Sequence, residues 1–129
     1  MEQEIIKQAF NKRLLDLPDG LGLQHTVFDN DPLKVDVKFP YQRASLHPIV
    51  IENYRDMGFY QISLSYPGDY YDSTEVEMMA KKIKDHFYRG FIFIEGNDKI
   101  IIERHPDSSR PYKNNKRLDM TIRIRYYCF

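Results

Sequence analysis

The stretch that decides the fold is GFYQISLSYPG, residues 58–68, in which apolar and polar side chains alternate. Successive side chains of a β-strand point to opposite faces, so this pattern predicts a half-buried strand over residues 59–66. Pro67-Gly68 ends it, because proline cannot donate to a strand ladder. Residues 118–129 alternate in the same way and predict a second long strand. The expected buried faces are Tyr60, Ile62, Leu64 and Tyr66 in the first strand, and Leu118, Met120, Ile122 and Ile124 in the second.

Helices are predicted before and after the first of these strands. Apolar residues recur at helical spacing in residues 4–17, and Pro18-Asp19-Gly20 ends that helix. Ser73 or Thr74 is expected to cap the second helix, since Thr74 and Glu77 have the spacing of a capping box. The two apolar stripes consist of Ile5, Ile6, Ala9, Phe10 and Leu14 in the first helix, and of Val76, Met79, Ala80, Ile83 and Phe87 in the second.

Between the first helix and the strand at 59–66, the pattern is mixed. Residues 25–29 suggest a short strand. Residues 33–39 alternate cleanly, with Lys34, Asp36 and Lys38 on the polar side, and predict a strand with one solvated face. Residues 40–57 show no period and contain two prolines, so we expect them to form a long functional arm.

The C-terminal part predicts more sheet. Gly90 should end the second helix, and residues 91–95 and 99–105 then flank the turn residues Gly96-Asn97-Asp98 of a hairpin. Its apolar runs lack polar alternation, so we expect both of its faces to be covered. Residues 106–116 are polar and are expected to form an exposed loop. The whole predicts one α+β domain, residues 1–129, with a mixed, mainly antiparallel sheet and two helices packed on one face.

Charge and composition exclude several classes of function. The chain has 129 residues, with 19 Lys plus Arg and 19 Asp plus Glu, so it is not a simple polyanion binder. Four scattered histidines and one cysteine cannot build a zinc site. The acidic N-terminus lacks the basic region of a signal peptide, and the apolar runs are too short to span a bilayer. We therefore expect a soluble intracellular protein with no membrane partner.

The zero net charge is a cancellation between two segments. Residues 1–98 carry 11 basic and 16 acidic side chains, whereas residues 99–129 carry 8 basic and 3 acidic ones. If the fold separates these segments, each subunit has one acidic and one basic surface, which suits head-to-tail contacts between subunits. If the fold interleaves them, the charge split carries no information about assembly. A nucleic-acid patch remains open for the basic segment, but few aromatics interleave with its charges, which favours a solvated or partner-facing surface.

One pattern suggests catalysis. Pro18-Asp19 followed by Asp36-Val37-Lys38 matches the loose signature of a PD-(D/E)xK nuclease, in which Asp19 and Asp36 would hold Mg²⁺ and Lys38 would lie near the attacked phosphate. The plainer interpretation is a helix-ending turn and a solvated strand face. Cys128 is expected to be a small buried hydrophobe rather than a nucleophile.

Several segments, in their order and spacing, resemble one family along nearly the whole chain. They are Pro40-Tyr41-Gln42-Arg43, residues 58–64, Pro67-Gly68, a helix ending in Phe87 before Gly90, and the closing strand at 122–126. The chain resembles the siphophage tail terminator (tail-completion) proteins and their prophage relatives of unknown function. It departs from their pattern at residues 69–72 and at Ile49-Val50-Ile51.

The resemblance implies a subunit that assembles into a ring, typically a hexamer, without catalysis, cofactor or metal. The ring would cap the finished tail tube, stop its polymerisation and offer a surface to the head connector. The partners implied are copies of itself, the major tail-tube protein and the head–tail connector protein, with DNA only passing through the lumen. The implied location is the head–tail joint of the virion, and the host cytoplasm during assembly. Two alternatives remain open: another neck or head-completion subunit, and the Mg²⁺ nuclease.

Contact residues are predicted in three places. The arm at 40–57 and the loop at 106–117 could reach neighbouring subunits, and two tyrosines follow Asp69 on a loop before the second helix. Tyrosine is enriched at interfaces, although one of the pair could instead cover the core. The predicted contact residues are Tyr41, Arg43, Tyr54 and Arg55 in the arm, Tyr70 and Tyr71 before the helix, and Arg110 and Lys113 in the loop.

Overall fold

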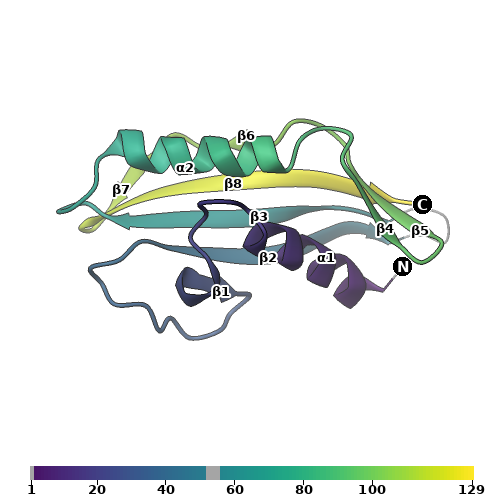
Figure 1. The fold of residues 1–129 in the computed structure, drawn as a ribbon, viewed down its shortest axis with the longest axis horizontal. Coiled ribbons are helices and arrows are strands. Elements are labelled where there is room, and N and C mark those ends of the chain that lie inside the picture. The colour runs from purple at the N-terminus through teal and green to yellow at the C-terminus, as the bar shows by residue number, and fades with distance from the viewer. Residues whose placement is uncertain (1, 52–55) are drawn as a thin grey trace.

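The computed structural model describes residues 2–51 and 56–129, and its elements combine two helices with one curled sheet (Figure 1). Tyr54 and Arg55, two of the predicted contact residues, lie outside the described residues. In chain order the elements are α1 (Gln3–Leu15), the 3₁₀ helix η1 (Leu23–His25), β1 (Thr26–Phe28), β2 (Tyr41–Ile51), β3 (Asp56–Pro67), α2 (Ser73–His86), β4 (Ile92–Glu95), β5 (Asp98–Ile102), β6 (Asp107–Ser108), β7 (Tyr112–Asn114) and β8 (Arg117–Cys128).

The sheet is built around two long strands, β3 and β8. They pair antiparallel from Met57 opposite Tyr127 to Pro67 opposite Arg117. β2 lies on the other side of β3, and β5, β6 and β7 each pair with a different part of β8. β1 runs parallel to β2, and every other described pairing is antiparallel. The predicted mixed, mainly antiparallel α+β architecture is therefore confirmed.

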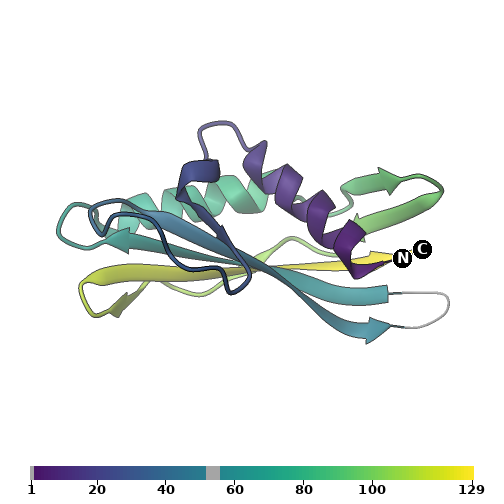
Figure 2. The same cartoon turned by 90° about the horizontal axis from the view of Figure 1, so that it is seen from below.

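Both helices lie on the same side of the sheet, as predicted (Figure 2). Their apolar stripes bury the face of β3 and β8 that the alternation identified, because every second side chain of those strands points to the helices. Phe10 lies at the centre, with its ring stacked at 4.8 Å on that of Tyr60 and 5.4 Å from that of Tyr126. Side chains with no exposed area include Ile6, Phe10, Tyr60, Ile62, Leu64, Val76, Ile83, Phe87, Ile122, Ile124 and Tyr126.

The cap of α2 differs from the predicted one. Asp72, not Ser73 or Thr74, is the N-cap, and its carboxylate accepts from the backbone N–H of Glu75 while the Glu75 side chain accepts from the N–H of Asp72. Asp72 has the extended backbone that an N-cap needs, whereas Ser73 is already helical. The capping box is thus real, but it begins two residues before the Thr74 and Glu77 pair.

The secondary structure of residues 33–39 and 41–51 differs from the prediction. The alternating segment 33–39 is an exposed loop, in which the side chain of Asp36 accepts from the N–H of Lys38 and its carbonyl accepts from the N–H of Phe39. These bonds form a local turn that competes with a strand. The expected arm is mostly β2, paired with β3 along its length. The predictions of a strand at 33–39 and of an irregular arm at 40–57 were therefore wrong.

The β4–β5 hairpin forms as predicted, with Gly96 at a positive φ of 65° in its turn. Its faces are not both covered: Phe93 packs against Phe10, but the exposed fractions of Ile92 and Ile94 are 44% and 70%. The polar segment 106–116 is also less irregular than expected, since β6 and β7 add short pairings to β8.

The two helices are joined by a reciprocal contact near their C-terminal ends. Arg13 donates from Nε and Nη2 to the backbone carbonyl of His86, at 3.2 and 2.6 Å. The imidazole Nε2 of His86 lies 2.8 Å from the carbonyl oxygen of Arg13, and only the ring nitrogen can donate in that pair. Partial burial is the largest effect on the pKa of His86 and lowers it; the hydrogen bond to the Arg13 carbonyl raises it, and the nearby guanidinium lowers it, so that the pKa is lowered on balance.

The partial burial of His86 predicts a loss of stability in mild acid. The unfolded chain takes up the His86 proton at a higher pH than the folded protein, so the stability gained from the neutral ring is complete above pH 6.5 and is lost as the pH falls through the lowered pKa. We expect the urea midpoint to fall less in His86→Gln than in the wild type between about pH 7.5 and about pH 5. His105→Gln, at an exposed position, is the control, and an equal fall in all three proteins would contradict the assignment.

Candidate functional site

Arg117 organises the end of the sheet where β2 begins and β3 ends. Its guanidinium donates to the hydroxyl of Ser65 at 2.6 Å and to the carbonyl oxygens of Val37 and Phe39 at 3.0 and 2.9 Å. It also lies 4.9 Å from the ring centroid of Tyr41. One side chain therefore ties the loop before β2 to two strands. In the sequence, Arg117 is one of the eight basic residues of the segment 99–129. No sequence pattern predicts that it holds the loop before β2.

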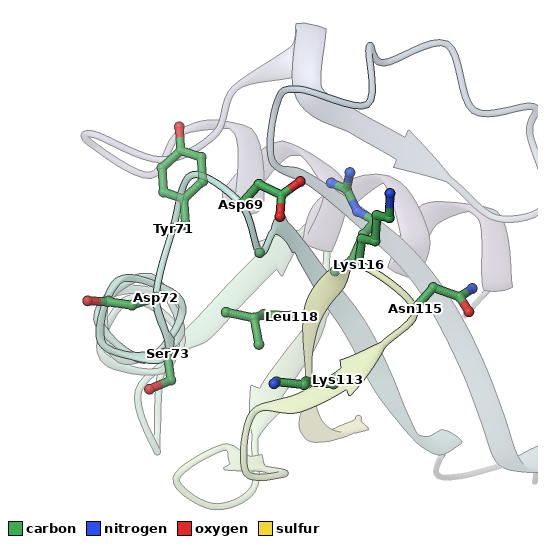
Figure 3. A pocket seen from close by; sticks show the side chains of 10 residues that line it. Asp69, Tyr71, Asp72, Ser73, Lys113, Asn115, Lys116 and Leu118 are labelled. Carbon is green, nitrogen blue, oxygen red and sulfur yellow. The ribbon is translucent and has the colours of Figure 1, made fainter.

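A pocket of about 530 Å³ opens beside this end, between the turn after β3 and the turn from β7 to β8 (Figure 3). The N–H of Gly68 donates to the carbonyl of Lys116 at 2.8 Å, and a Cβ on Gly68 would approach that oxygen to 2.9 Å, so glycine permits the close approach. Asp69 and Asp72 lie on one side of the pocket, and Lys113 and Lys116 on the other.

The pocket has the chemistry of a contact surface. Its lining residues include neither histidine nor cysteine, so Ser73 has no imidazole there to activate its hydroxyl. Opposite charges across an open hollow suit a polar protein partner. The lining residues are Gly68, Asp69, Tyr71, Asp72, Ser73, Lys113, Asn115, Lys116, Arg117 and Leu118.

The predicted contact residues have different surroundings. Tyr70 is 64% exposed, whereas the ring of Tyr71 packs edge-on against that of Tyr66 at 5.1 Å. Burial, with a smaller effect of Tyr71, raises the pKa of Tyr66 to about 12. Arg43 donates to the carbonyl oxygens of Asp29 and Asp31, at 2.8 and 2.9 Å, and so holds the loop after β1. Tyr41, Tyr71 and Lys113 come together at the Arg117 end, and Arg110 is exposed between β6 and β7.

The nuclease pattern requires a strand that carries Asp36 and Lys38, and the structure has no strand at these residues. Asp36 and Lys38 lie in a turn rather than on one face of a strand, and Asp19 is in a turn after α1 with a φ of 59°. Within residues 2–51 and 56–129, no cluster of three or more His, Cys, Asp or Glu side chains could hold a metal ion. Cys128 is buried, as predicted, and burial raises the pKa of its thiol to about 11, so it stays protonated at neutral pH.

Residues 5–126 match the family described as phage tail terminator protein. The chain belongs to that family. The predicted resemblance is thereby confirmed, and the match runs from α1 through β8. No curated protein matches the chain. One solved structure, of a protein whose name describes no function, has a TM-score of 0.78 and 20% sequence identity, covering 100% of this chain and 96% of that one. At that identity the likeness supports the fold alone.

Membership of the tail terminator family indicates what kind of protein this is. The chain is a phage structural protein with a role in completing the tail, it is part of the virion tail, and it interacts with other phage tail or head proteins. Within the described residues, no helix is long and apolar enough to cross a membrane. The residues gathered around Arg117 are then candidates for contact with those proteins.

Proposed function

We propose that this tail terminator assembles as a single domain into a ring that caps the tail tube, ends its polymerisation and offers a docking surface to the head connector. The observation that carries the proposal is the family match over residues 5–126. Its partners are further copies of itself, in a hexamer by analogy with the family it resembles, and the major tail-tube and connector proteins. DNA passes through the lumen, and no catalysis is involved.

The exposed area of the subunit is large enough for two contacts with neighbouring subunits. The subunit exposes 7972 Å², and two head-to-tail contacts of about 800 Å² each would cover about a fifth of that area. We keep the predicted contact residues as part of the proposal, with Tyr70, Arg110 and Lys113 reaching partners directly and Arg43 acting through the loop that it holds. The full set is Tyr41, Arg43, Tyr54, Arg55, Tyr70, Tyr71, Arg110 and Lys113.

Two measurements test the ring and its role together. Light scattering behind a sizing column, over a wide range of protein concentration, gives the mass of the assembly. Addition of the protein to polymerising tail-tube subunits, followed by electron microscopy, shows whether tubes stop growing and carry a ring at one end. A strict monomer at high concentration that also fails to bind tubes would refute the proposal.

Arg43→Glu is expected to reduce ring formation and also to loosen the loop after β1. The guanidinium holds two loop carbonyls, so its removal should speed proteolytic cleavage within residues 29–39. Lys113→Glu is the matched comparison, because that side chain is exposed on β7. It should reduce ring formation without changing the cleavage rate. Unchanged assembly in both variants would remove these residues from the interface.

A further inference from the structure

The face of the sheet that carries no helices has exposed basic side chains around a half-buried phenylalanine. Phe59 on β3 is flanked there by His47 and Arg125, its direct partners on β2 and β8. The rings of His47 and Phe59 stack at 4.9 Å, and the guanidinium of Arg123 lies 5.0 Å from the Phe59 centroid. Arg125 is exposed and forms no ion pair with another described residue. Two acidic residues neighbour these arginines: Asp107 is the direct partner of Arg123, and the N–H of Glu103 donates to the carbonyl of Arg125 at 2.9 Å. We call His47, Phe59, Arg123 and Arg125 the basic sheet face.

Toward the β4–β5 hairpin the same sheet face becomes apolar. Ile92 and Ile94 point away from the core, because Phe93 between them packs on Phe10. Their exposed fractions are 44% and 70%, and that of Phe129 is 54%. Arginine and phenylalanine are enriched in protein interfaces, and arginine is among the residues that supply most of the binding energy there.

A complementary surface lies on the helix layer, on the opposite side of the subunit (Figure 2). Residues 69–80 contain four carboxylates and neither lysine nor arginine. Two of them, Asp69 and Asp72, share the pocket with lysines of the β7–β8 turn, whereas Glu75 and Glu77 do not line it. Asp72 and Glu75 form the capping box, but Glu77 is exposed and makes no ion pair with another described residue. Tyr70 and Met78 lie in the same segment, with 64% and 57% of their area exposed. We call residues 69–80 the acidic helix end.

We propose that the acidic helix end of one subunit docks on the basic sheet face of the next copy. The inference rests on the proposed ring and names its subunit contact. The two surfaces are opposite in charge and lie on opposite layers, so one subunit can use both at once, as a head-to-tail ring requires. A contact of the sheet face with itself would place arginine against arginine. Tyr70 and Met78 supply the apolar anchors.

A charge exchange tests this pairing in the full-length protein. Arg125→Glu and Glu77→Arg, made singly, are each expected to weaken ring association about tenfold, because like charges then meet in every contact. The double variant restores opposite charges and should recover association to within about threefold of the wild type. Arg89→Glu makes the same charge change at an exposed position outside both surfaces and should leave association unchanged.

Each outcome bears on the pairing. Wild-type association in both single variants, or no recovery in the double variant, overturns it while leaving the ring itself intact. A wild type that forms no ring under any condition counts instead against the proposed function. Binding of a short DNA duplex that is lost in Arg125→Glu and not regained in the double variant would show that the basic sheet face is a nucleic-acid site, and would also overturn the pairing. Circular dichroism confirms that each variant is folded.

Discussion

Replacing Phe10 with alanine is expected to lower the free energy of unfolding by about 3–5 kcal/mol. The ring is fully buried, and its removal leaves a cavity where both helices meet the sheet. A small domain has only about 5–15 kcal/mol of stability, so this loss is a large part of the total. Urea unfolding followed by circular dichroism measures it. The Phe10 ring packs on those of Tyr60, Phe87, Phe93 and Tyr126.

Two further variants show whether the loss comes from the cavity. Gln8→Ala lies on the same helix at an exposed position and should change the free energy of unfolding by less than about 0.5 kcal/mol. Phe10→Leu keeps part of the buried volume and should fall between the two. A loss below about 1 kcal/mol for Phe10→Ala would mean that the neighbouring rings close over the space.

The parts of the fold that the sequence predicted are those with one fully buried face. α1, α2, β3 and β8 each present a periodic apolar stripe to the core around Phe10, so the period alone reveals them. The same logic predicted the layer arrangement, because two stripes and one sheet face can be buried together only if both helices cover that face.

β2 and the segment 33–39 show where this logic fails. On the core side of β2, Gln42 is 2% exposed and its amide donates to the hydroxyl of Thr26, so a polar residue occupies a buried position and hides the period. Pro48 falls on the part of β2 beyond the reach of β1, where its missing N–H is tolerated. Residues 33–39 alternate well, but among the described strands none pairs with them. Alternation shows that a segment could bury one face as a strand. Whether it forms a strand depends on a neighbouring strand with which it can pair.

The candidate site was only partly visible in the sequence. Tyrosines and basic residues could be chosen by type, but the role of Arg117 depends on carbonyl oxygens about 80 residues away along the chain. Only part of the basic segment gathers on one face of the sheet. Arg123 and Arg125 alternate with buried isoleucine and tyrosine, so the strand presents its positive charge on the helix-free face. Lys113 and Lys116 instead line one pocket with Asp69 and Asp72, so the fold separates the two charged segments only in part.

Replacing Gly58 with alanine is expected to lower the free energy of unfolding by about 1–3 kcal/mol, because the added methyl group overpacks the sheet interior. A Cβ there would lie 2.5 Å from the carbonyl oxygen of His47, 2.7 Å from the hydroxyl of Tyr126 and 3.0 Å from the Cα of Pro48. Two of these three atoms belong to backbone and cannot swing away. Urea unfolding is again the measurement, and Ser63→Ala on the same strand is the control, with an expected change within about 0.5 kcal/mol.

A variant at Tyr126 separates the contribution of its hydroxyl from that of the backbone atoms that a Cβ at Gly58 would meet. The hydroxyl is buried and has no hydrogen-bond partner among the described residues, so Tyr126→Phe should be neutral or slightly stabilising, since it removes an unsatisfied polar atom. In the Gly58→Ala background the same change also removes one of the three close contacts, so the double variant should recover part of the lost stability. The carbonyl of His47 stays in place, so recovery should be incomplete. Additive effects of the two substitutions would show that the sheet shifts away from the methyl group at this point instead of pressing it against the hydroxyl.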